Sequence, residues 1–145
     1  MEIRVTPEAF EPGAVLTRFS AGLSGAGAVV SFSGVVRPDD GLTALEIEHY
    51  PAMTEAAIRK HADDAMARFK LLDVLVIHRH GRLYPGDTIM MVAAAAAHRR
   101  AAFDAADFLM DYLKSRAPFW KKEISATGEI WVVAKDEDEA ALRRW

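Results

Sequence analysis

The stretch AVVSFSGVVRPDDGLTALEIEHY, residues 28–50, contains two strand-like runs separated by a turn sequence. The first run, Ala28–Val36, is rich in β-branched and aromatic residues, which is typical of a buried strand. Pro38-Asp39-Asp40-Gly41 is typical of a turn, and Leu42–Tyr50 continues as a second strand-like run. The pattern predicts that these two strands form a hairpin or lie as near neighbours.

Outward from this stretch, strand-like and helix-like segments alternate. A helix is predicted from Pro51 to about Phe69, because apolar residues recur there at the spacing of one buried face. A second long helix is predicted from Ala97 or His98 to Arg116, since Pro118 disfavours helical geometry at the residue before it. The remaining expected segments are strands at Met1–Val5, Leu71–His80, Thr88–Ala95, Phe119–Ser125 and Glu129–Ala134, an irregular-to-helical Pro7–Phe19, and a charged tail of helical character at Lys135–Trp145.

Two principal helices among several strands, with few regular βαβ crossovers, favour an α+β fold with a largely antiparallel sheet. The 145 residues fit one domain, 1–145, with 51% hydrophobic residues to build its core. The glycine-containing segment Gly22–Gly27 precedes a strand and matches no phosphate-loop pattern, so it is interpreted as a turn.

The composition excludes several classes of function. With 18 basic and 21 acidic side chains, the chain has a net charge of −3 and lacks the basic field of a nucleic-acid-binding protein. The longest uncharged apolar run, Ile89–Ala97, is far shorter than the ~20 residues of a membrane span. The start of the chain lacks the pattern of a signal peptide, so we expect a cytoplasmic protein. With no cysteine, the chain offers no thiol nucleophile and no Cys-ligated metal.

The second long helix and the segment after it concentrate positive charge. A helical wheel places Lys114 and Arg99 on the same stripe as Phe103. A lysine on an apolar stripe either extends to the edge or lines a pocket, and one that is desolvated beside other cations has a lowered pKa that suits proton transfer or nucleophilic attack. The alternative is a solvated helix face with ion pairs at helical spacing.

Further cations follow at positions that the fold can bring together. If the strand after Pro118 turns back along the helix, Lys121 can face Lys114, whereas strand alternation sends Lys122 to the opposite face. Arg37 follows the first strand, in a loop. An anion-binding pocket for a phosphorylated or carboxylated substrate is therefore predicted from Arg37, His98, Arg99, Lys114 and Lys121.

The histidines give a weaker signal. His78 and His80 have the spacing of two imidazoles on one face of a strand, which is compatible with a metal site. The sequence shows no obvious third ligand, so a hydrogen-bonded structural or interface role is favoured and no metal site is predicted.

Several segments together resemble the large, catalytic subunit of molybdopterin synthase, over nearly the whole chain and in order. They are Gly27–Arg37 (GAVVSFSGVVR), Leu45–Met53 (LEIEHYPAM), Ile77–Gly81 (IHRHG), His98-Arg99 with Ala102-Phe103, Asp111–Lys114 (DYLK) and Pro118–Glu123 (PFWKKE). The ordered set is far more specific than any one fragment.

The resemblance implies a sulfurtransferase of molybdenum-cofactor biosynthesis. Such an enzyme converts cyclic pyranopterin monophosphate (precursor Z) to molybdopterin by installing two dithiolene sulfurs. The sulfur donor is the C-terminal Gly-Gly thiocarboxylate of a small ubiquitin-like subunit, which agrees with the lack of cysteine. The resemblance also implies a central homodimer with a small subunit at each end, no resident cofactor, and an α/β-hammerhead-like fold with a small β subdomain.

By position, Lys114 and Lys121 resemble the family's essential lysines. The residues that resemble the lining of the tail and pterin-phosphate pocket are Phe32, Arg37, His98, Arg99, Lys122 and Glu123, with Met110 as a further member of the wall. The family resemblance also implies a site shared across the dimer. Lys135 stands where many members have arginine, which keeps the charge but loses the bidentate fork.

The expected mechanism follows from charge. Two anions, a cyclic phosphate and a thiocarboxylate, must meet in one pocket, which requires fixed cations such as Arg37, His98 and Arg99. Lys114 is then expected to act as a proton shuttle and Lys121 to orient the thiocarboxylate or assist release of the acyl group. The alternatives are a non-catalytic adaptor that grips the tail of a ubiquitin-like protein, and a phosphate-ligand sensor of the same shape.

Overall fold

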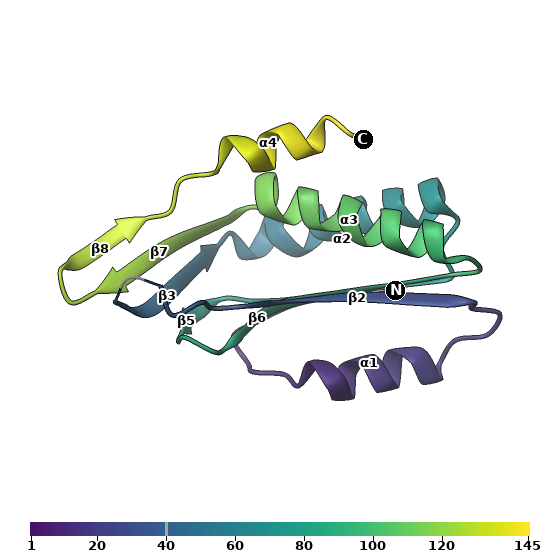
Figure 1. The fold of residues 1–145 in the computed structure, drawn as a ribbon, viewed down its shortest axis with the longest axis horizontal. Coiled ribbons are helices and arrows are strands. Elements are labelled where there is room, and N and C mark those ends of the chain that lie inside the picture. Colours follow the sequence, from purple (N-terminus) through teal and green to yellow (C-terminus); the bar gives the residue numbers. More distant parts are fainter. Residues whose placement is uncertain (40) are drawn as a thin grey trace.

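The computed structural model describes residues 1–39 and 41–145 (Figure 1). A first sheet has the order β1-β4-β6-β2, in which only the β1–β4 pair is parallel. A second sheet, β5-β3-β7-β8, is antiparallel throughout. The strands are β1 (Glu2–Thr6), β2 (Ala28–Val35), β3 (Leu42–His49), β4 (Asp73–Arg79), β5 (Gly81–Leu83), β6 (Thr88–Ala96), β7 (Phe119–Ser125) and β8 (Gly128–Trp131).

Helices cover both faces of the first sheet. The helices are α1 (Pro12–Ala21), α2 (Pro51–Phe69), α3 (Arg99–Ser115) and α4 (Asp136–Leu142), with α1 on one face and α2 and α3 on the other (Figure 1). Pro12 and Pro51 each occupy the first turn of a helix, where the missing backbone N–H costs nothing. Among the described residues, no helix is both long and apolar enough to cross a membrane. The predicted α+β class, largely antiparallel with two main helices, is confirmed.

The central strands β4 and β6 are buried on both sides, so each contributes to two cores. On β4, Val74 and Val76 pack toward α2 and α3, whereas Leu75 and Ile77 pack toward α1. This explains the nearly continuous apolar runs of these strands, since a strand covered on both faces has no solvent side. A third, smaller cluster around Ile47 lies under the second sheet.

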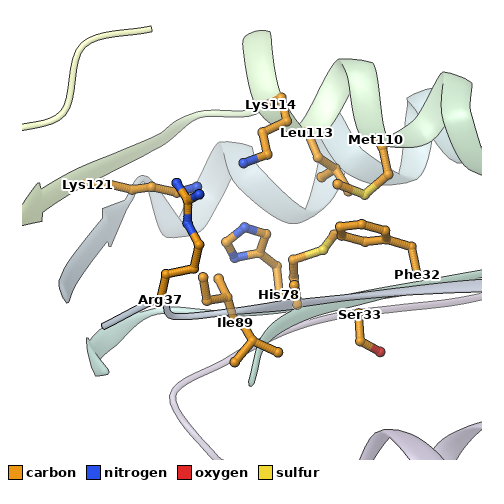
Figure 2. Close-up of a pocket in the computed structure, with 12 residues that line it drawn as sticks. Phe32, Ser33, Arg37, His78, Ile89, Met110, Leu113, Lys114 and Lys121 are labelled. Atoms are coloured by element: carbon orange, nitrogen blue, oxygen red, sulfur yellow. The ribbon is translucent and has the colours of Figure 1, made fainter. Parts of the chain in front are cut away.

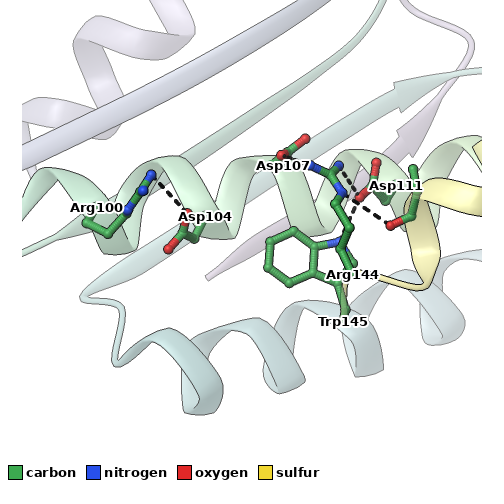
Figure 3. A network of polar contacts seen from close by, with 7 residues as sticks. Arg100, Asp104, Asp107, Asp111, Arg144 and Trp145 are labelled. Atoms are coloured by element: carbon green, nitrogen blue, oxygen red, sulfur yellow. Dashed lines mark hydrogen bonds and ion pairs between the residues drawn. The ribbon is translucent and has the colours of Figure 1, made fainter.

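The C-terminal segment closes the chain against α3. Asp111, on α3, accepts hydrogen bonds from Arg144 and from the indole N–H of Trp145, both at 2.7 Å (Figure 3). Arg144 also pairs with Asp107 at 2.8 Å. Asp111 is only 8% exposed, so its carboxylate has lost most of its contact with water. The hydrogen bonds from Arg144 and Trp145 compensate for that loss.

The predicted hairpin of residues 28–36 and 42–50 is wrong. β2 pairs with β6 in the first sheet, while β3 pairs with β5 and β7 in the second. A local turn sequence predicts a change of direction but not the partner, and here the longer ladders are formed with distant strands. Part of the predicted turn, Asp40, lies outside the described residues.

One predicted strand differs clearly in extent, and one observed strand was not predicted. The expected strand at Glu129–Ala134 is shorter and begins earlier, as β8, Gly128–Trp131. β5, Gly81–Leu83, was not expected, since three residues are too few for a periodic signal.

Candidate active site

Three neighbouring cavities open where α3 and β7 approach the ends of β2 and β6. The first has a volume of about 300 Å³ and lies between the first sheet and α3 (Figure 2). The second, of about 500 Å³, extends along the second sheet, and the third, of about 570 Å³, lies between β2 and the exposed face of α3. Lys114 lines all three cavities.

Cations stand at the junction of the first two cavities. These cavities share Arg37, Lys114 and Lys121, together with the apolar Val35 and Ile89. Figure 2 shows the three cationic side chains converging from three different elements: the segment after β2, the end of α3, and β7. The arrangement can therefore hold two anionic groups that enter from different sides.

Lys121 is half-buried and chemically perturbed. Its pKa is lowered from 10.5 to about 8, mainly by burial and to a smaller extent by repulsion from Lys114, whereas Asp138 acts to raise it. Strand alternation puts Lys121 on the same face of β7 as Phe119 and Glu123. An amine with a pKa near 8 exchanges protons readily near neutral pH, which suits general acid–base chemistry.

Lys114 is exposed and lies in the last turn of α3. The predicted apolar stripe centred on Phe103 is wrong, because Phe103 is 57% exposed. The buried face instead runs along Ala102, Ala105, Leu109 and Leu113, where small alanines allow α3 to pack closely on the sheet. Lys114 thus lies at the edge of the packed face and reaches the cavities from there.

The predicted pocket residues do not all meet at one cavity. Phe32, Met110, Arg37, Lys114 and Lys121 line the first cavity, as expected. The Arg37 guanidinium is mostly exposed and pairs with Asp39 at 3.2 Å, so an incoming anion competes with one carboxylate.

His98 and Arg99 are not brought to these cavities within one chain. His98 is the N-cap of α3 and Arg99 its first residue, whereas Lys114 is near the other end. Fifteen residues of α-helix separate Arg99 from Lys114 by about 22 Å. The expectation that a single chain gathers all five predicted cations therefore fails, because a straight helix keeps its ends apart.

Lys122 and Glu123 occupy different surfaces. Lys122 pairs with Glu129 at 3.3 Å and lies over the Trp131 ring at 4.7 Å, on the face of β7 opposite Lys121. Glu123 lines the second cavity. Lys135 lines that cavity too, with Ile130 and Val132 on its apolar wall.

Of the residues that line the first cavity and were not in the predicted set, His78 carries a titratable side chain. His78 is 2% exposed and stacks on Phe119, with ring centroids 3.8 Å apart. Burial, opposed by a hydrogen bond to the Arg79 carbonyl and assisted by Lys121 and Lys114, lowers the pKa of His78 to about 3. The His80 ring instead lies against the His49 ring, with centroids 4.2 Å apart and planes tilted by 42°, and no cluster of three metal-ligating side chains occurs within the described part of the chain.

Comparison with known proteins identifies the family of this chain. The family model described as MoaE protein matches residues 5–116. The molybdopterin synthase catalytic subunit of Cereibacter sphaeroides is 62% identical over 146 residues, covering 100% of both chains. The fold is similar to the molybdopterin biosynthesis MoaE protein of Burkholderia ambifaria, with a TM-score of 0.86, 46% identity, and coverage of 99% of this chain and 97% of that one.

The molybdopterin synthase of Staphylococcus aureus is more distant, with a TM-score of 0.78 and 29% identity, covering 91% of this chain and 96% of that one. The resemblance seen in the sequence is confirmed, since both the family match and the relatives extend over most of the chain. The chain belongs to the MoaE family of molybdopterin synthase catalytic subunits.

Proposed function

We propose that this chain catalyses sulfur transfer to cyclic pyranopterin monophosphate, using the C-terminal thiocarboxylate of a small ubiquitin-like subunit as the donor. The observation that carries the proposal is the junction of two cavities at Arg37, Lys114 and Lys121. The first cavity, of about 300 Å³, is the smaller, and the second, of about 500 Å³, is lined by residues of three strands of the second sheet, which suits a small heterocycle and a peptide tail respectively. The name of the relatives, catalytic subunit, agrees with the existence of a second subunit.

The second cavity has the features of a groove for an extended peptide. Its walls carry Leu42, Leu45, Ile130 and Val132, and its inner end reaches Lys114 and Lys121. An extended tail advances about 3.3 Å per residue, so a few residues span such a groove and deliver a terminal group to its inner end. A Gly-Gly terminus fits this narrow junction because it has no side chains.

The charges at the junction favour the meeting of two anions. A phosphate and a thiocarboxylate repel each other, and that repulsion grows in a partly dry site. Three cations placed around the meeting point offset it, and fixed positive groups also stabilise negative charge that develops during reaction. Arg37, Lys114 and Lys121 all line the first cavity and are the cations to which we assign this role.

We propose a different division of roles between the two lysines from the one expected from the sequence. We assign proton transfer to Lys121, whose pKa of about 8 matches that task, and anion binding to the exposed Lys114. In each transfer a C–S bond forms and a C–O bond breaks, and the Lys121 ammonium donates a proton to the departing oxygen. Hydrolysis of the resulting thioester by one water leaves sulfur on the pterin and returns the tail as a carboxylate.

Two copies of the chain would complete the site. β2 is an edge strand; Phe32 on β2 is 43% exposed, and Phe103 on α3, which lines the same cavity, is 57% exposed. If β2 and α3 of one copy lie antiparallel to those of another, the α3 N-terminus of the partner approaches this copy's cavities. His98 and Arg99 then contribute their charges across the interface, which accounts for their distance from Lys114 within one chain.

Reconstitution tests the activity directly. The purified chain is mixed with a thiocarboxylated small subunit and cyclic pyranopterin monophosphate, and the dithiolene pterin is measured. Lys114→Ala and Lys121→Ala should each lower turnover at least about 100-fold while partner binding stays near native. Lys60→Ala is the matched control, because Lys60 is an exposed lysine on α2, outside the lining of all three cavities. A tight complex with no product would favour the adaptor alternative.

Mixed dimers test the shared site. Arg99→Ala and Lys114→Ala chains are each expected to be inactive alone. Mixing them creates dimers in which one site receives both defects and the other receives neither, so activity returns in part. No recovery, in a mixture shown by native mass spectrometry to contain mixed dimers, would refute the shared site.

A further inference from the structure

His78 is a buried histidine at the first cavity that neither the charge pattern nor the family resemblance placed in the site. It is the next-to-last residue of β4, paired with Met90 on one side and Val5 on the other. Val74 and Val76, on the same face of β4, pack toward α2 and α3. His78 continues this row at the point where the apolar core opens into the cavity (Figure 2).

The hydrogen bonding of His78 fixes its tautomer. Its Nδ1 lies 2.8 Å from the carbonyl oxygen of Arg79, and a carbonyl oxygen only accepts, so Nδ1 carries the proton. A neutral imidazole has one N–H, which leaves a free lone pair on Nε2. Burial and the nearby ammonium groups hold the ring in this neutral form at pH 7.

The position of the ring relates it to Lys121. The imidazole stacks on Phe119 with an angle of 15° between the planes, and Phe119 lies two residues before Lys121 on the same face of β7. The titratable and charged groups that act on His78 are Lys121 from β7, Lys114 from α3 and His49 from β3. In Figure 2 the ring lies at the centre of the cavity, among the cationic side chains.

The polar side chains of this cavity are otherwise mostly donors. When they are charged, Arg37, Lys114 and Lys121 can donate hydrogen bonds but cannot accept them. The Ser33 hydroxyl points away from the cavity in Figure 2. We propose that His78 is a positioning residue for Lys121, whose ammonium group donates an N–H to the Nε2 lone pair and is thereby aimed at the reacting oxygen. This role rests on the proposed function of Lys121.

Such a hydrogen bond has a consequence that simple packing lacks. A neutral acceptor stabilises the charged form of the lysine and therefore raises its pKa, against the effect of burial. If His78 only filled space, a phenylalanine stacked on Phe119 would replace it with no effect on Lys121. The titration of Lys121 therefore separates positioning from packing.

The test uses the full chain with lysines reductively dimethylated with ¹³C-formaldehyde, and Lys121→Arg identifies the NMR signal of Lys121. His78→Phe keeps the stacked ring and removes the acceptor, with His78→Leu as a second acceptor-free variant. His78→Gln returns an acceptor at the ε position. The control is His61→Phe, since His61 also stacks on aromatic rings, Phe108 at 4.3 Å and Tyr112 at 3.9 Å, but does not line the three cavities.

His78→Phe is expected to lower the pKa of Lys121 by about one unit, and His78→Gln to restore most of it. In the reconstituted reaction, His78→Phe should lower kcat about tenfold or more with little change in KM, because the lost interaction aims a group at the transition state. His61→Phe should change neither quantity.

An unchanged Lys121 pKa in both acceptor-free variants would overturn the proposal, as would a His78→Gln variant no better than His78→Phe. Failure of the native chain to form product would instead refute the proposed function. The lysine titration is read without substrate, so the two failures are distinguishable.

Discussion

Acidification is expected to destabilise this fold through one buried side chain, His78. Its pKa is lowered from 6.5 to about 3, chiefly by burial, whereas in the unfolded chain the imidazole is exposed to water. Between these two values the unfolded state binds more protons than the folded state. The free energy of unfolding must therefore fall as the pH drops below about 6.5.

The magnitude follows from the two pKa values. At pH 5 nearly all unfolded chains carry a proton on this residue and nearly no folded chains do, which costs about 2 kcal/mol relative to pH 7. The result changes little for any folded pKa of about 4 or lower, because the folded imidazole is then neutral at pH 5. A loss of this size is a sizeable fraction of the ~5–15 kcal/mol that stabilises a typical domain.

Guanidinium unfolding followed by far-UV circular dichroism measures this loss. Native and His78→Phe chains are compared at pH 7 and pH 5 at one protein concentration, because oligomers make stability concentration-dependent. The two proteins share every titratable group except His78, so the contributions of the shared groups cancel in the comparison. Between pH 7 and pH 5 the variant's free energy of unfolding should therefore fall by about 2 kcal/mol less than that of the native chain. Equal losses in the two proteins would refute a buried, neutral His78.

Three further changes have defined outcomes. Gly27→Ala would place a Cβ 2.2 Å from the backbone oxygen of Ala97 and should cost about 1–3 kcal/mol, whereas an unchanged Tm would contradict the close approach of these segments. Asp111→Ala removes the carboxylate that accepts hydrogen bonds from Arg144 and Trp145, and it should lower the free energy of unfolding by about 2 kcal/mol and speed hydrogen exchange in α4. Native exchange rates would show that these contacts do not hold the C-terminal segment against α3. Lys114→Arg keeps the charge and should retain activity within about tenfold, whereas Lys121→Arg cannot release its proton and should lose about 100-fold or more in kcat, and equal effects would reject the division of roles.

Much of the fold could be predicted because its elements are locally encoded. The apolar spacing after Pro51 and the proline after Arg116 predicted two helices whose observed limits agree closely. Strand pairing was different. The ladder between β2 and β6 joins Ala28 to Ala96, and no local pattern specifies a partner so distant in the chain.

The phase of α3 shows another limit of sequence analysis. The sequence analysis centred the buried stripe on Phe103, but in the structure Phe103 is exposed and small alanines together with leucines form the buried face. Hydrophobic size alone does not distinguish a helix face that packs within the chain from one that remains available for a second chain. The exposed Phe103 is therefore consistent with the shared site proposed above.

The site could be predicted where residues are close along β7 and the end of α3, as for Lys114 and Lys121. His78 was missed because its role depends on stacking with Phe119, which lies on β7, two strands and one helix further along the chain than β4. In the sequence, a histidine near another histidine suggests a metal site or a structural role. The third interpretation, that His78 positions Lys121, depends on the stacked geometry. The hydrogen bond to Arg79 then determines which nitrogen faces the cavity.

The two lysines differ because different elements carry them. β7 lies in a sheet whose inner face is covered, so Lys121 loses water and its pKa falls to about 8. Lys114 extends from the last turn of α3 and remains exposed, where it lines all three cavities and is favourably placed near the helix C-terminus. A strand thus supplies a group that can exchange a proton, and a helix end supplies a cation at the meeting point of both proposed substrates. Sulfur transfer between two anions requires both properties, and no single lysine environment provides them together.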